Sequence, residues 1–471
     1  MTEKLTLTIG GKPVDTKARL EVRNPASGDV FADVPDAGRA ELDQAVAAAR
    51  AAFAGWRDTP WAERQALVSR IGDVLKENAE ELARMLTREQ GKPTAQALGE
   101  LSGAAGWCKA TASLDLPDRV IEDNDSRYCV TRYEPIGIVG GISPWNFPVL
   151  LSTWKIAAAL VTGNTLVLKP SPFTPMTVLR LGELLRDVVP PGVLNVISGG
   201  DALGPMMTEH PGIGKISFTG SSATGRKVMA SAAGNLKRLT LELGGNDAAI
   251  VFPDVDVEAT AKKLFWSAFS NSGQVCIATK RAYVHDDIFE PMVSALTALV
   301  RSTPMGDGSQ QGNALGPIQN QPQLERVREL VDASQQAGDT LVQGKAPADG
   351  GYFVPLTLVV EPQEDSPIVV KEQFGPVLPL LRFSDEDDVV ARANRSDMGL
   401  AATVWTADED RGLRIAGKLE TGSVWINESM AISPLAPFGG RKQSGVGVEN
   451  GIEGLMAYTE PKTISIKRSP P

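Results

Sequence analysis

One of the three cysteines in this chain lies in a segment suited to nucleophilic chemistry. Cys276 follows the polar, glycine-containing run 271–275, which comes directly after an expected helix end at 265–270. A thiol in an accessible loop can lose its proton and attack, whereas a buried thiol is inert. Cys108 and Cys129 lie in a helix-like and a strand-like stretch, which favours a structural interpretation for both. Cys276 is therefore the candidate nucleophile.

A carboxylate and an amide stand at places where they can assist such a thiol. Glu242 ends the strand-like run 238–243 and is followed by two glycines, so it is a candidate base toward water or a thiol. The alternative for Glu242 is a solvated loop charge. Asn146 lies among two prolines and two aromatic residues in 144–148, and a rigid amide donor of this kind suits an oxyanion hole. Its alternative is a turn asparagine that bonds its own backbone.

Two further segments are suited to binding an anionic cofactor. The run 218–225 is expected to pass from a strand through a glycine turn into a helix, and the N–H groups at a helix N-terminus suit a pyrophosphate. The run Lys169-Pro170-Ser171 closes another expected strand, where an ammonium and a hydroxyl can hold ribose or phosphate oxygens. The usual dinucleotide fingerprint, Gly-x-Gly-x-x-Gly, does not occur.

The composition excludes several other kinds of site. With only His210 and His285 present, a Ser-His-Asp triad or a histidine-rich metal site is hard to build, and no metal is expected. The formal net charge of −10 argues against a general affinity for nucleic acid or anionic membranes. Three widely spaced cysteines do not make a disulfide framework, and the first residues lack the apolar run of a signal peptide. No uncharged apolar stretch reaches about 18 residues. We therefore expect a cytoplasmic protein.

The order of the expected elements predicts an α/β fold. A chain of 471 residues is too long for one hydrophobic core. The first hundred residues are expected to be mainly helical, and from about residue 136 short apolar strands alternate with amphipathic helices. This alternation indicates a parallel sheet covered by helices on both faces, with ligands at the carboxyl ends of the strands. The expected strands are 136–139, 165–168, 194–197, 215–219 and 238–243, and the expected helices include 149–161 and 176–189. A second run of the same kind begins near 248–252 and continues past residue 420, which predicts a second α/β domain.

Taken in order, these fragments resemble the aldehyde dehydrogenase superfamily over nearly the whole chain. The resemblance is to the NAD(P)-dependent, hydrolytic type, which does not acylate coenzyme A. Eight segments carry it: 144–148, 169–171, 218–225, 242–245, 273–276, 372–376, 425–427 and 437–440.

The resemblance implies three structural parts. A Rossmann-like NAD(P)-binding domain would comprise residues 1–115 and 136–244, and a catalytic α/β domain would comprise 245–443. A small β oligomerisation element would combine 116–135 with 459–471. An exposed strand edge of that kind normally pairs with another subunit, so a homodimer or a homotetramer is expected.

The resemblance also implies a mechanism. Cys276 would attack the aldehyde, with Asn146 and the Cys276 backbone N–H as the oxyanion hole. After hydride transfer to the nicotinamide, Glu242 would activate a water that hydrolyses the thioester. Lys155 and Glu460 match positions of a proton relay, and an ordinary ion pair is the alternative for them.

Further residues match cofactor and substrate positions. Glu372 would hold the nicotinamide ribose, and Phe374 would support the ring. The adenosine and pyrophosphate side would be held by Trp145, Lys169, Ser171, Gly220, Ser221 and Gly225. The substrate funnel would include Leu151, Met430, Ile432, Leu435 and Phe438, an apolar set that suggests medium-chain or aromatic aldehydes.

Two positions depart from the family pattern. Many NAD-preferring members have an acidic residue where this chain has Pro172, so we expect NADP to be accepted as well as NAD. Val448 stands where arginine is common, and we attach no function to that change.

Three rival interpretations remain at this point. A coenzyme-A-acylating member would not need Glu242 to activate water. A cofactor-free cysteine hydrolase built on a Cys-Glu-Lys set would leave 218–225 and 372–376 without a purpose. A non-catalytic protein that kept the fold would have no need of Cys276, Glu242 and Asn146.

Overall fold

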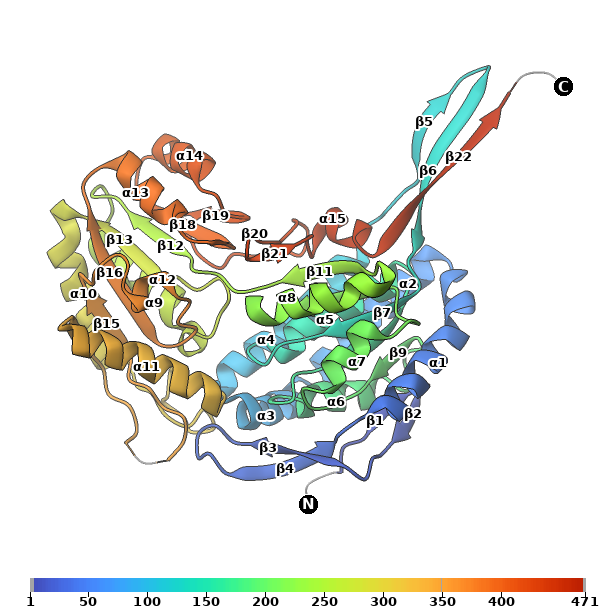
Figure 1. Cartoon of the computed structure of the whole chain (residues 1–471), viewed down its shortest axis with the longest axis horizontal. Helices are drawn as coiled ribbons and strands as arrows, with labels where there is room; N and C mark the ends of the chain where they lie inside the picture. Colours follow the sequence, from blue (N-terminus) through green and yellow to red (C-terminus); the bar gives the residue numbers. More distant parts are fainter. Residues whose placement is uncertain (1–3, 349, 469–471) are drawn as a thin grey trace.

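The computed structural model describes residues 4–348 and 350–468. Two lobes, each built on its own large β-sheet, lie side by side, and a narrow three-stranded arm projects from the first lobe (Figure 1). The two α/β domains expected from the sequence therefore correspond to two separate sheets.

The first lobe contains an eight-stranded sheet in the order β2-β1-β9-β8-β7-β10-β11-β21. Its five central strands are mutually parallel. They are β7 (Ile138–Ile142), β8 (Thr165–Lys169), β9 (Leu194–Val196), β10 (Lys215–Thr219) and β11 (Arg238–Glu242). Each overlaps a strand expected from the sequence, and β7, β8 and β10 are buried at every position. Burial on both faces is why β7 and the middle of β8 are continuous apolar or glycine runs, whereas β10 alternates polar and apolar residues that are all buried.

The N-terminal segment differs from the sequence expectation, because it begins with strands rather than helices. β1 (Leu7–Ile9) and β2 (Lys12–Val14) extend the first sheet, and β3 (Arg19–Arg23) and β4 (Val30–Pro35) form a separate hairpin. Strands of three to six residues contain too few positions for a two-residue period to stand out. On the opposite edge, β21 (Gly445–Val446) pairs antiparallel with β11.

Helices cover both faces of the first sheet. On one face α5 (Pro148–Val161) and α6 (Met176–Leu184) are backed by α2 (Trp61–Glu77), α3 (Ala79–Gln90) and α4 (Thr94–Ala112). On the other face lie α1 (Arg39–Arg57), α7 (Leu203–Glu209), α8 (Ser222–Ala232) and the short η1 (Ala233–Asn235). Helix α6 ends five residues earlier than its expected end at 189, because the chain turns before the proline pair at 190–191.

The second lobe contains a seven-stranded sheet in the order β14-β15-β16-β13-β12-β18-β19. Only the β14/β15 pair is antiparallel. The strands are β12 (Ala248–Val251), β13 (Arg281–His285), β14 (Thr340–Gln343), β15 (Thr357–Val360), β16 (Val377–Phe383), β18 (Ala401–Trp405) and β19 (Ser423–Ile426).

Two hydrophobic clusters lie on opposite faces of this second sheet. One is covered by α9 (Val257–Phe269) and α10 (Phe289–Ser302). The other is covered by α11 (Gln321–Ala337), α12 (Pro367–Val370), α13 (Glu386–Asn394) and α14 (Glu409–Lys418). The remaining short elements are η2 (Ser270–Gly273), η3 (Asp286–Ile288), β17 (Met398–Gly399), β20 (Arg441–Lys442) and α15 (Gly451–Met456).

The arm is an antiparallel sheet of β5 (Arg119–Asp123), β6 (Arg127–Pro135) and β22 (Thr459–Lys467). Strands from two distant parts of the chain thus pair in the arm, and residues 469–471 of the element that the resemblance implied lie outside the described residues. The arm extends away from both lobes (Figure 1). Most side chains of its edge strands β5 and β22 are exposed.

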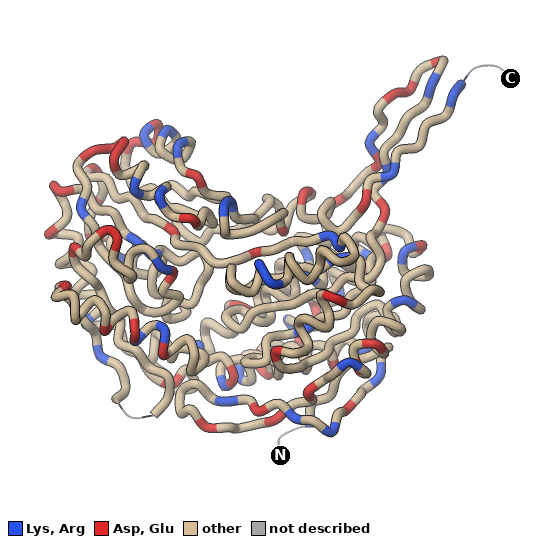
Figure 2. The backbone as a smooth tube through the Cα atoms, in the orientation of Figure 1, with Lys and Arg blue, Asp and Glu red and all other residues tan. Residues whose placement is uncertain are grey.

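Charges of both signs are spread over the two lobes and the arm (Figure 2). In the part of the chain that the structure describes, no helix has the length and apolar character needed to cross a bilayer.

Candidate active site

A pocket of about 130 Å³ lies where the two lobes meet. It brings together nine of the site residues expected from the sequence: Trp145, Asn146, Leu151, Gly220, Ser221, Glu242, Cys276, Glu372 and Phe374. The pocket is also lined by Gln323 and Arg326, which lie outside every segment singled out in the sequence.

The strand order explains why residues so far apart in sequence meet here. From β7 the chain moves to β8 and β9 on one side, and β10 and β11 then lie on the other side of β7. The order therefore reverses between β7 and β10, which is where open α/β sheets bind ligands. Asn146 follows β7, Ser221 follows β10, and Glu242 is the last residue of β11.

The loop that carries Cys276 is rigid. After α9 ends, the residues Asn271, Ser272 and Gly273 all adopt positive φ angles, which reverses the chain direction. A side chain at Gly273 would overlap the Gly375 carbonyl, so the close approach of the two loops requires glycine. The buried Gln274 amide holds the turn, since its Nε2 donates to Asn271 O over 2.9 Å and its Oε1 accepts from Gln319 N over 2.8 Å.

The thiol and the carboxylate in the pocket are both held in their neutral forms. Burial, together with the charge of Glu242, raises the pKa of the Cys276 thiol well above its usual value. Burial raises the pKa of Glu242 to about 8, against the opposing effect of the Lys155 ammonium. Both carboxyl oxygens of Glu242 are buried and have no hydrogen-bond partner among the described residues. A raised pKa makes the ionised form of Glu242 a stronger base, so the fraction that is ionised can take a proton from the neighbouring thiol.

Asn146 is fixed in place by contacts on both of its ends. Its side-chain Nδ2 donates to Gln274 O over 3.0 Å, which uses one of the two amide protons. Its backbone oxygen accepts from the Lys92 ammonium over 2.9 Å and from Asn271 Nδ2 over 3.1 Å. Lys92 is itself buried in an ion pair with Glu100, 2.6 Å away. The second Nδ2 proton remains available to a ligand in the pocket.

The partner of Lys155 is Glu449, and the expectation that Glu460 takes part in a relay is wrong. Lys155 Nζ lies 3.1 Å from Glu449 Oε1 and donates to the hydroxyls of Ser217 and Thr219 over 3.0 and 2.9 Å. Glu460 is exposed at the base of the arm, in β22, where it forms an ion pair with Arg238. Glu449 precedes α15 in an irregular segment, and only the folded chain brings it under α5.

Glu372 and Phe374 form the wall opposite β11. Glu372 Oε1 accepts from the Gly245 N–H over 3.0 Å, and Gly244 leaves room for this carboxylate because any side chain there would overlap it. Phe374 makes an edge-to-face contact with Trp145, with ring centroids 5.3 Å apart. Trp145 of the first lobe and the segment 372–374 of the second lobe therefore close the pocket together.

Gln323 and Arg326 were not found from the sequence. Both lie in the first two turns of α11, where Gln323 Nε2 donates to Phe374 O over 3.0 Å and Arg326 donates to Glu372 O over 2.9 Å. Gln323 and Arg326 reach the pocket because α11 packs against 372–376. No motif within the helix indicates that they do so.

The expected phosphate-binding segment starts a helix as predicted. Ser221 is the N-cap of α8 and its Oγ accepts from Thr224 N over 3.2 Å. Gly225 does not line the pocket. A side chain there would meet Leu243 at 2.5 Å, so this glycine allows α8 to pack closely on the end of β11.

Lys169, Ser171 and Pro172 lie at the carboxyl end of β8, and they do not line the 130 Å³ pocket. Burial lowers the pKa of Lys169 to about 8, although the carboxylates of Asp201 and Asp36 oppose this. Ser171 Oγ accepts from Phe173 N over 3.3 Å in a tight turn that includes Pro172. Asp201 and Asp36 therefore lie near the end of β8, where Pro172 replaces the acidic residue of many family members.

An apolar cluster adjoins Cys276 on the side away from α8. It contains four of the five residues expected in the substrate funnel: Leu151, Met430, Ile432 and Phe438. Leu435 is 56% exposed and is not part of the cluster. Trp154 joins the cluster, stacking on Trp107 at 5.1 Å and meeting Phe438 edge-on at 5.8 Å.

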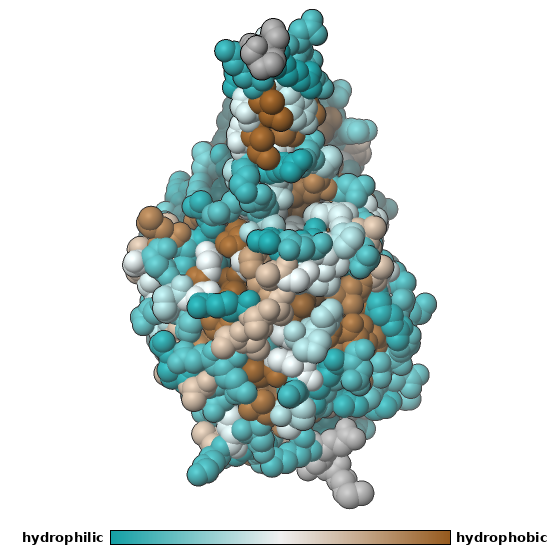
Figure 3. Space-filling view, turned by 90° about the vertical axis from the view of Figure 1, so that its right-hand side faces the viewer, coloured by the Kyte–Doolittle hydropathy of each residue, from teal (hydrophilic) through white to brown (hydrophobic). Residues whose placement is uncertain are grey.

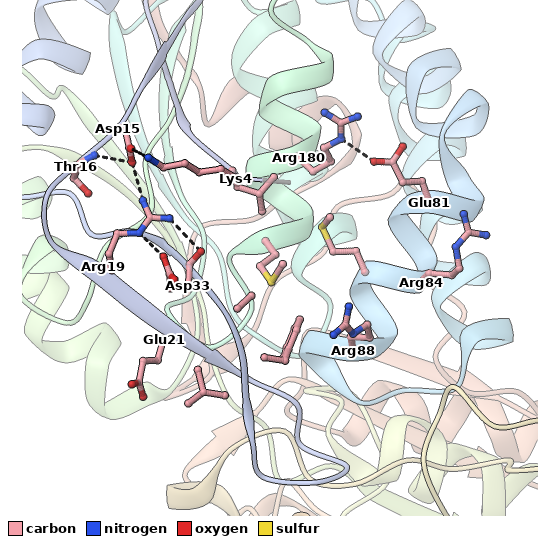
Figure 4. A pocket seen from close by; sticks show the side chains of 16 residues that line it. Lys4, Asp15, Thr16, Arg19, Glu21, Asp33, Glu81, Arg84, Arg88 and Arg180 are labelled. Atoms are coloured by element: carbon pink, nitrogen blue, oxygen red, sulfur yellow. Dashed lines mark hydrogen bonds and ion pairs between the residues drawn. The ribbon is translucent and has the colours of Figure 1, made fainter. Parts of the chain in front are cut away.

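A larger hollow of about 1400 Å³ lies between the β3–β4 hairpin and helices α3 and α6 (Figure 4). Its charged groups are largely paired with one another. Lys4 and Arg19 both contact Asp15, and Arg180 lies 2.8 Å from Glu81. Because its lining contains no thiol and few free charges, the candidate active site is the smaller pocket around Cys276.

Known proteins are similar to this chain in both sequence and structure. Residues 13–464 match the model of the aldehyde dehydrogenase family. The chain belongs to the aldehyde dehydrogenase family. A curated relative from Pseudomonas sp., named "Probable aldehyde dehydrogenase", is 44% identical over 466 residues, which cover 98% of this chain and 95% of the relative. The resemblance inferred from the eight sequence segments is thereby confirmed.

Solved structures of this family have the same fold. An NAD⁺ complex of an aldehyde dehydrogenase from Bacillus cereus is 37% identical and superimposes with a TM-score of 0.96, covering 99% of this chain and 97% of that one. An NADP-dependent enzyme from E. coli is 36% identical with a TM-score of 0.95, covering 98% of each chain. The α/β fold predicted from the sequence is confirmed as that of an aldehyde-oxidising enzyme.

Proposed function

We propose that this protein oxidises an aldehyde to a carboxylic acid through a thioester on Cys276, with NAD or NADP as the oxidant. The observation that carries the proposal is the meeting of Cys276, Glu242 and Asn146 in one pocket at the junction of the lobes. Each has the chemistry that one part of the reaction requires, namely a nucleophile, a base and an oxyanion donor.

The acylation step uses the thiol and its two neighbouring donors. Glu242 takes the proton of Cys276, and the thiolate attacks the aldehyde carbon to give a thiohemiacetal oxyanion. This oxygen accepts hydrogen bonds from the free Asn146 Nδ2 proton and from the Cys276 N–H, which has no acceptor among the described residues. Loss of a hydride from the same carbon then leaves a thioester.

The residues around the pocket suit a dinucleotide. The N-terminus of α8 opens on it at Ser221, and N–H groups at such a terminus favour a pyrophosphate. An adjoining cleft of about 470 Å³ shares Ser221, Arg326 and Glu372 with the pocket and is rich in arginine. The nicotinamide, when bound, supplies the hydride acceptor. Trp145, Phe374 and Glu372 would hold it, and Lys169, Ser171, Pro172 and Gly220 would contact or shape the adenosine side.

Deacylation depends on Glu242 and the groups behind it. Before deacylation Glu242 releases the proton of Cys276 to solvent; as a carboxylate again, it takes a proton from a water that attacks the thioester, and the carboxylic acid leaves as the Cys276 thiolate reforms. Lys155 lies close enough to lower the pKa of Glu242, and Glu449 acts in the opposite direction. The Lys155–Glu449 pair therefore adjusts the basicity of Glu242 from behind the pocket.

The experiment that tests the proposal uses the three cysteines. Cys276→Ala should abolish NADH formation from aldehyde while nucleotide binding persists. Cys108→Ala and Cys129→Ala should keep most activity, because both thiols are buried away from the pocket. NADH formation near the wild-type rate by the Cys276 variant would disprove the mechanism.

The two enzymatic rivals give different outcomes in the same assay. A coenzyme-A-acylating enzyme would turn over faster with coenzyme A than with water. A cofactor-free hydrolase would cleave an ester or amide without nucleotide and would not reduce NAD or NADP. The substrate class we propose is medium-chain or aromatic aldehydes, since the cluster beside Cys276 is apolar and contains five aromatic side chains, those of Trp107, Phe147, Trp154, Trp425 and Phe438. A panel of aldehydes assayed with both nucleotides tests it.

We assign a separate function to each lobe and to the arm. We propose that residues 1–115 and 136–244 bind the nucleotide, that 245–443 carry the catalytic cysteine, and that 116–135 with 459–471 join subunits into a homodimer or homotetramer. The exposed apolar side chains of Val120, Ile121 and Ile466 on the arm support the last point (Figure 3). Three free cysteines are compatible with the proposed cytoplasmic location.

A further inference from the structure

A buried lysine holds the backbone on both sides of the nucleophile. Lys280 is 2% exposed and lies four residues after Cys276, directly before β13. Its Nζ donates to the carbonyl oxygen of Val275 over 2.8 Å and to that of Cys276 over 2.5 Å. The ammonium thus bridges two successive carbonyls of the loop.

One of these carbonyls belongs to the peptide group that matters for catalysis. The Val275 carbonyl and the Cys276 N–H are parts of the same planar peptide unit, and no cis peptide occurs in the described chain. In a trans peptide the C=O and N–H bonds point in opposite directions. A donor that fixes the Val275 oxygen therefore also fixes the direction of the Cys276 N–H.

The neighbouring contacts leave that N–H without an acceptor among the described residues. The Gln274 carbonyl accepts from Asn146 Nδ2 over 3.0 Å, and the Val275 carbonyl also accepts from the Ala278 N–H over 3.1 Å. Three successive carbonyls are therefore bonded, whereas the Cys276 N–H donates to no acceptor within residues 4–348 and 350–468.

The charge of Lys280 is balanced by carboxylates on the far side of the loop. Asp247 is buried, with both carboxyl oxygens unbonded within the described chain, and its backbone oxygen accepts from the Lys280 N–H over 2.9 Å. Burial raises the pKa of Asp247 to about 7, and Lys280 opposes that effect. Glu242, Asp247 and Glu372 are the carboxylates that act on Cys276, and Lys280 is the cation that opposes them.

We propose that Lys280 is a positioning residue that orients and polarises the Cys276 N–H for the thiohemiacetal oxyanion. A charged donor on a carbonyl draws electron density through the peptide unit, which strengthens hydrogen bonds given by its N–H. The inference rests on the proposed function, because it requires an oxyanion next to Cys276.

The test compares a reaction that forms an oxyanion with one that does not. Aldehyde oxidation is followed as the pre-steady-state burst of NADH, and the reactivity of the thiol is followed as alkylation of Cys276 by iodoacetamide, across a range of pH. Loss of a complete oxyanion donor slows acyl transfer by about 10²–10³. For Lys280→Met, which leaves the N–H present but unsupported, the burst rate should fall roughly 10–100-fold more than alkylation does at each pH.

The chain offers a matched control in Lys237. It is also buried, and its Nζ also donates to two carbonyls, of His210 over 2.6 Å and of Ile213 over 2.8 Å, far from the pocket. Lys237→Met should lower thermal stability by a similar amount while the ratio of burst rate to alkylation rate stays at its wild-type value. If Lys280→Met folds poorly, the charge-neutral pair Lys280→Met with Asp247→Asn carries the same comparison.

Equal losses of burst and alkylation in the Lys280 variants would overturn the inference, since Lys280 would then act only on thiol ionisation or on folding. Asn146→Ala separates this result from failure of the proposed function. A slow burst in Asn146→Ala with an unchanged ratio in Lys280→Met rejects the role of Lys280 alone. A normal burst in Asn146→Ala rejects the oxyanion hole itself.

Discussion

At the scale of single residues, the pocket works by keeping two ionisable groups neutral. Cys276 and Glu242 line the same small pocket, and burial raises the pKa of each. Two negative charges so close together in a poorly solvated site repel each other, so the pair holds at most one charge easily. A proton released by the thiol therefore has the ionised Glu242 as its acceptor. Once that proton has passed to solvent, the same carboxylate serves as the base for water on the thioester.

The first prediction is that thioester hydrolysis accelerates with rising pH up to about pH 8. Glu242 must be ionised to act as a base, and a carboxyl with a pKa of about 8 is only about 10% ionised at pH 7. The deacylation rate should therefore rise close to tenfold per pH unit below the midpoint and level off above it. Stopped-flow measurement of turnover after the NADH burst checks this. A flat profile between pH 5 and 9 would exclude Glu242 as the base.

The second prediction separates the two halves of the reaction. Glu242→Gln keeps the thiol and the oxyanion donors but removes the base, which typically slows the dependent step by about 10²–10⁴. Steady-state turnover should fall by that factor while a stoichiometric NADH burst survives, because the thioester accumulates. Mass spectrometry of the quenched protein should find the acyl group on Cys276. Loss of the burst itself would mean that thiol deprotonation by Glu242 limits acylation as well.

At the scale of elements, the groups that adjust the site come from segments that meet only in the folded chain. Lys155 is on α5, Glu449 precedes α15, and Ser217 lies within β10. All three are buried and bonded together behind the pocket. A buried pair of this kind adds little net stability, but loss of one partner leaves an uncompensated charge and costs about 3–5 kcal/mol.

The third prediction distinguishes Glu449 from Glu460. Glu449→Gln removes a charge that raises the pKa of Glu242 and leaves Lys155 free to lower it. The pH midpoint of deacylation should therefore move down, on the order of one unit, and the protein should lose about 3–5 kcal/mol of stability. Glu460→Gln, in an exposed ion pair with Arg238, should change both values little. A larger midpoint shift in the Glu460 variant would reverse the assignment.

The fourth prediction concerns the choice between NAD and NADP at the end of β8. Pro172 supplies no carboxylate there, but Asp201 lies close enough to Lys169 to oppose the lowering of its pKa. A 2′-phosphate beside that carboxylate would be repelled. Two like charges about 4 Å apart repel by roughly 4 kcal/mol at an effective dielectric of ~20, before screening. Asp201→Asn should therefore raise kcat/KM with NADP relative to NAD.

The matched change for this prediction is Pro172→Glu, which should shift the preference towards NAD mainly by losing activity with NADP. For the wild type we expect the two kcat/KM values to lie within about a hundredfold, or ~2.7 kcal/mol. A wild-type preference for NAD beyond about a thousandfold that disappears in Asp201→Asn would assign the selection to Asp201 rather than to position 172.

At the scale of the whole molecule, the arm is the part that projects from the first lobe, away from the packed elements of both lobes (Figure 1). Its strands β5, β6 and β22 form a sheet with two open edges; the side chains of the edge strands β5 and β22 are mostly exposed, whereas 129–131 in the central strand β6 are buried. A three-stranded sheet without a hydrophobic face covered by other elements is only marginally stable. Docking against a second copy would bury the apolar side chains of Val120, Ile121 and Ile466.

The fifth prediction is that a charge on the arm weakens assembly. Burying one such side chain contributes about 1.5–3 kcal/mol, so Ile466→Arg should raise the dissociation constant of the oligomer at least tenfold. Light scattering over a dilution series measures this. Leu413→Arg, an equally exposed apolar side chain on α14, is the control and should leave the mass unchanged. A wild-type protein that is monomeric at all concentrations would refute the proposed role of the arm.

The sequence alone determined what depends on local order along the chain. The central strands β7 to β11 were predictable because each is a short segment with apolar residues between turn signals, and their alternation with helices leaves few possible sheet topologies. Cys276, Glu242, Asn146 and Ser221 were predictable because each lies in a short segment of distinctive composition at a strand or helix end.

Only the tertiary structure decided which distant groups face one another. Lys155 has Glu449 rather than Glu460 as its partner, Arg326 and Gln323 reach the pocket from α11, and Lys280 bridges the carbonyls around the nucleophile. None of these side chains belongs to a motif, because a charge or an amide can perform its task from any element that packs within hydrogen-bond distance. The short strands β1 to β4 were missed for the related reason that pairing with distant segments, rather than their own pattern, makes them strands.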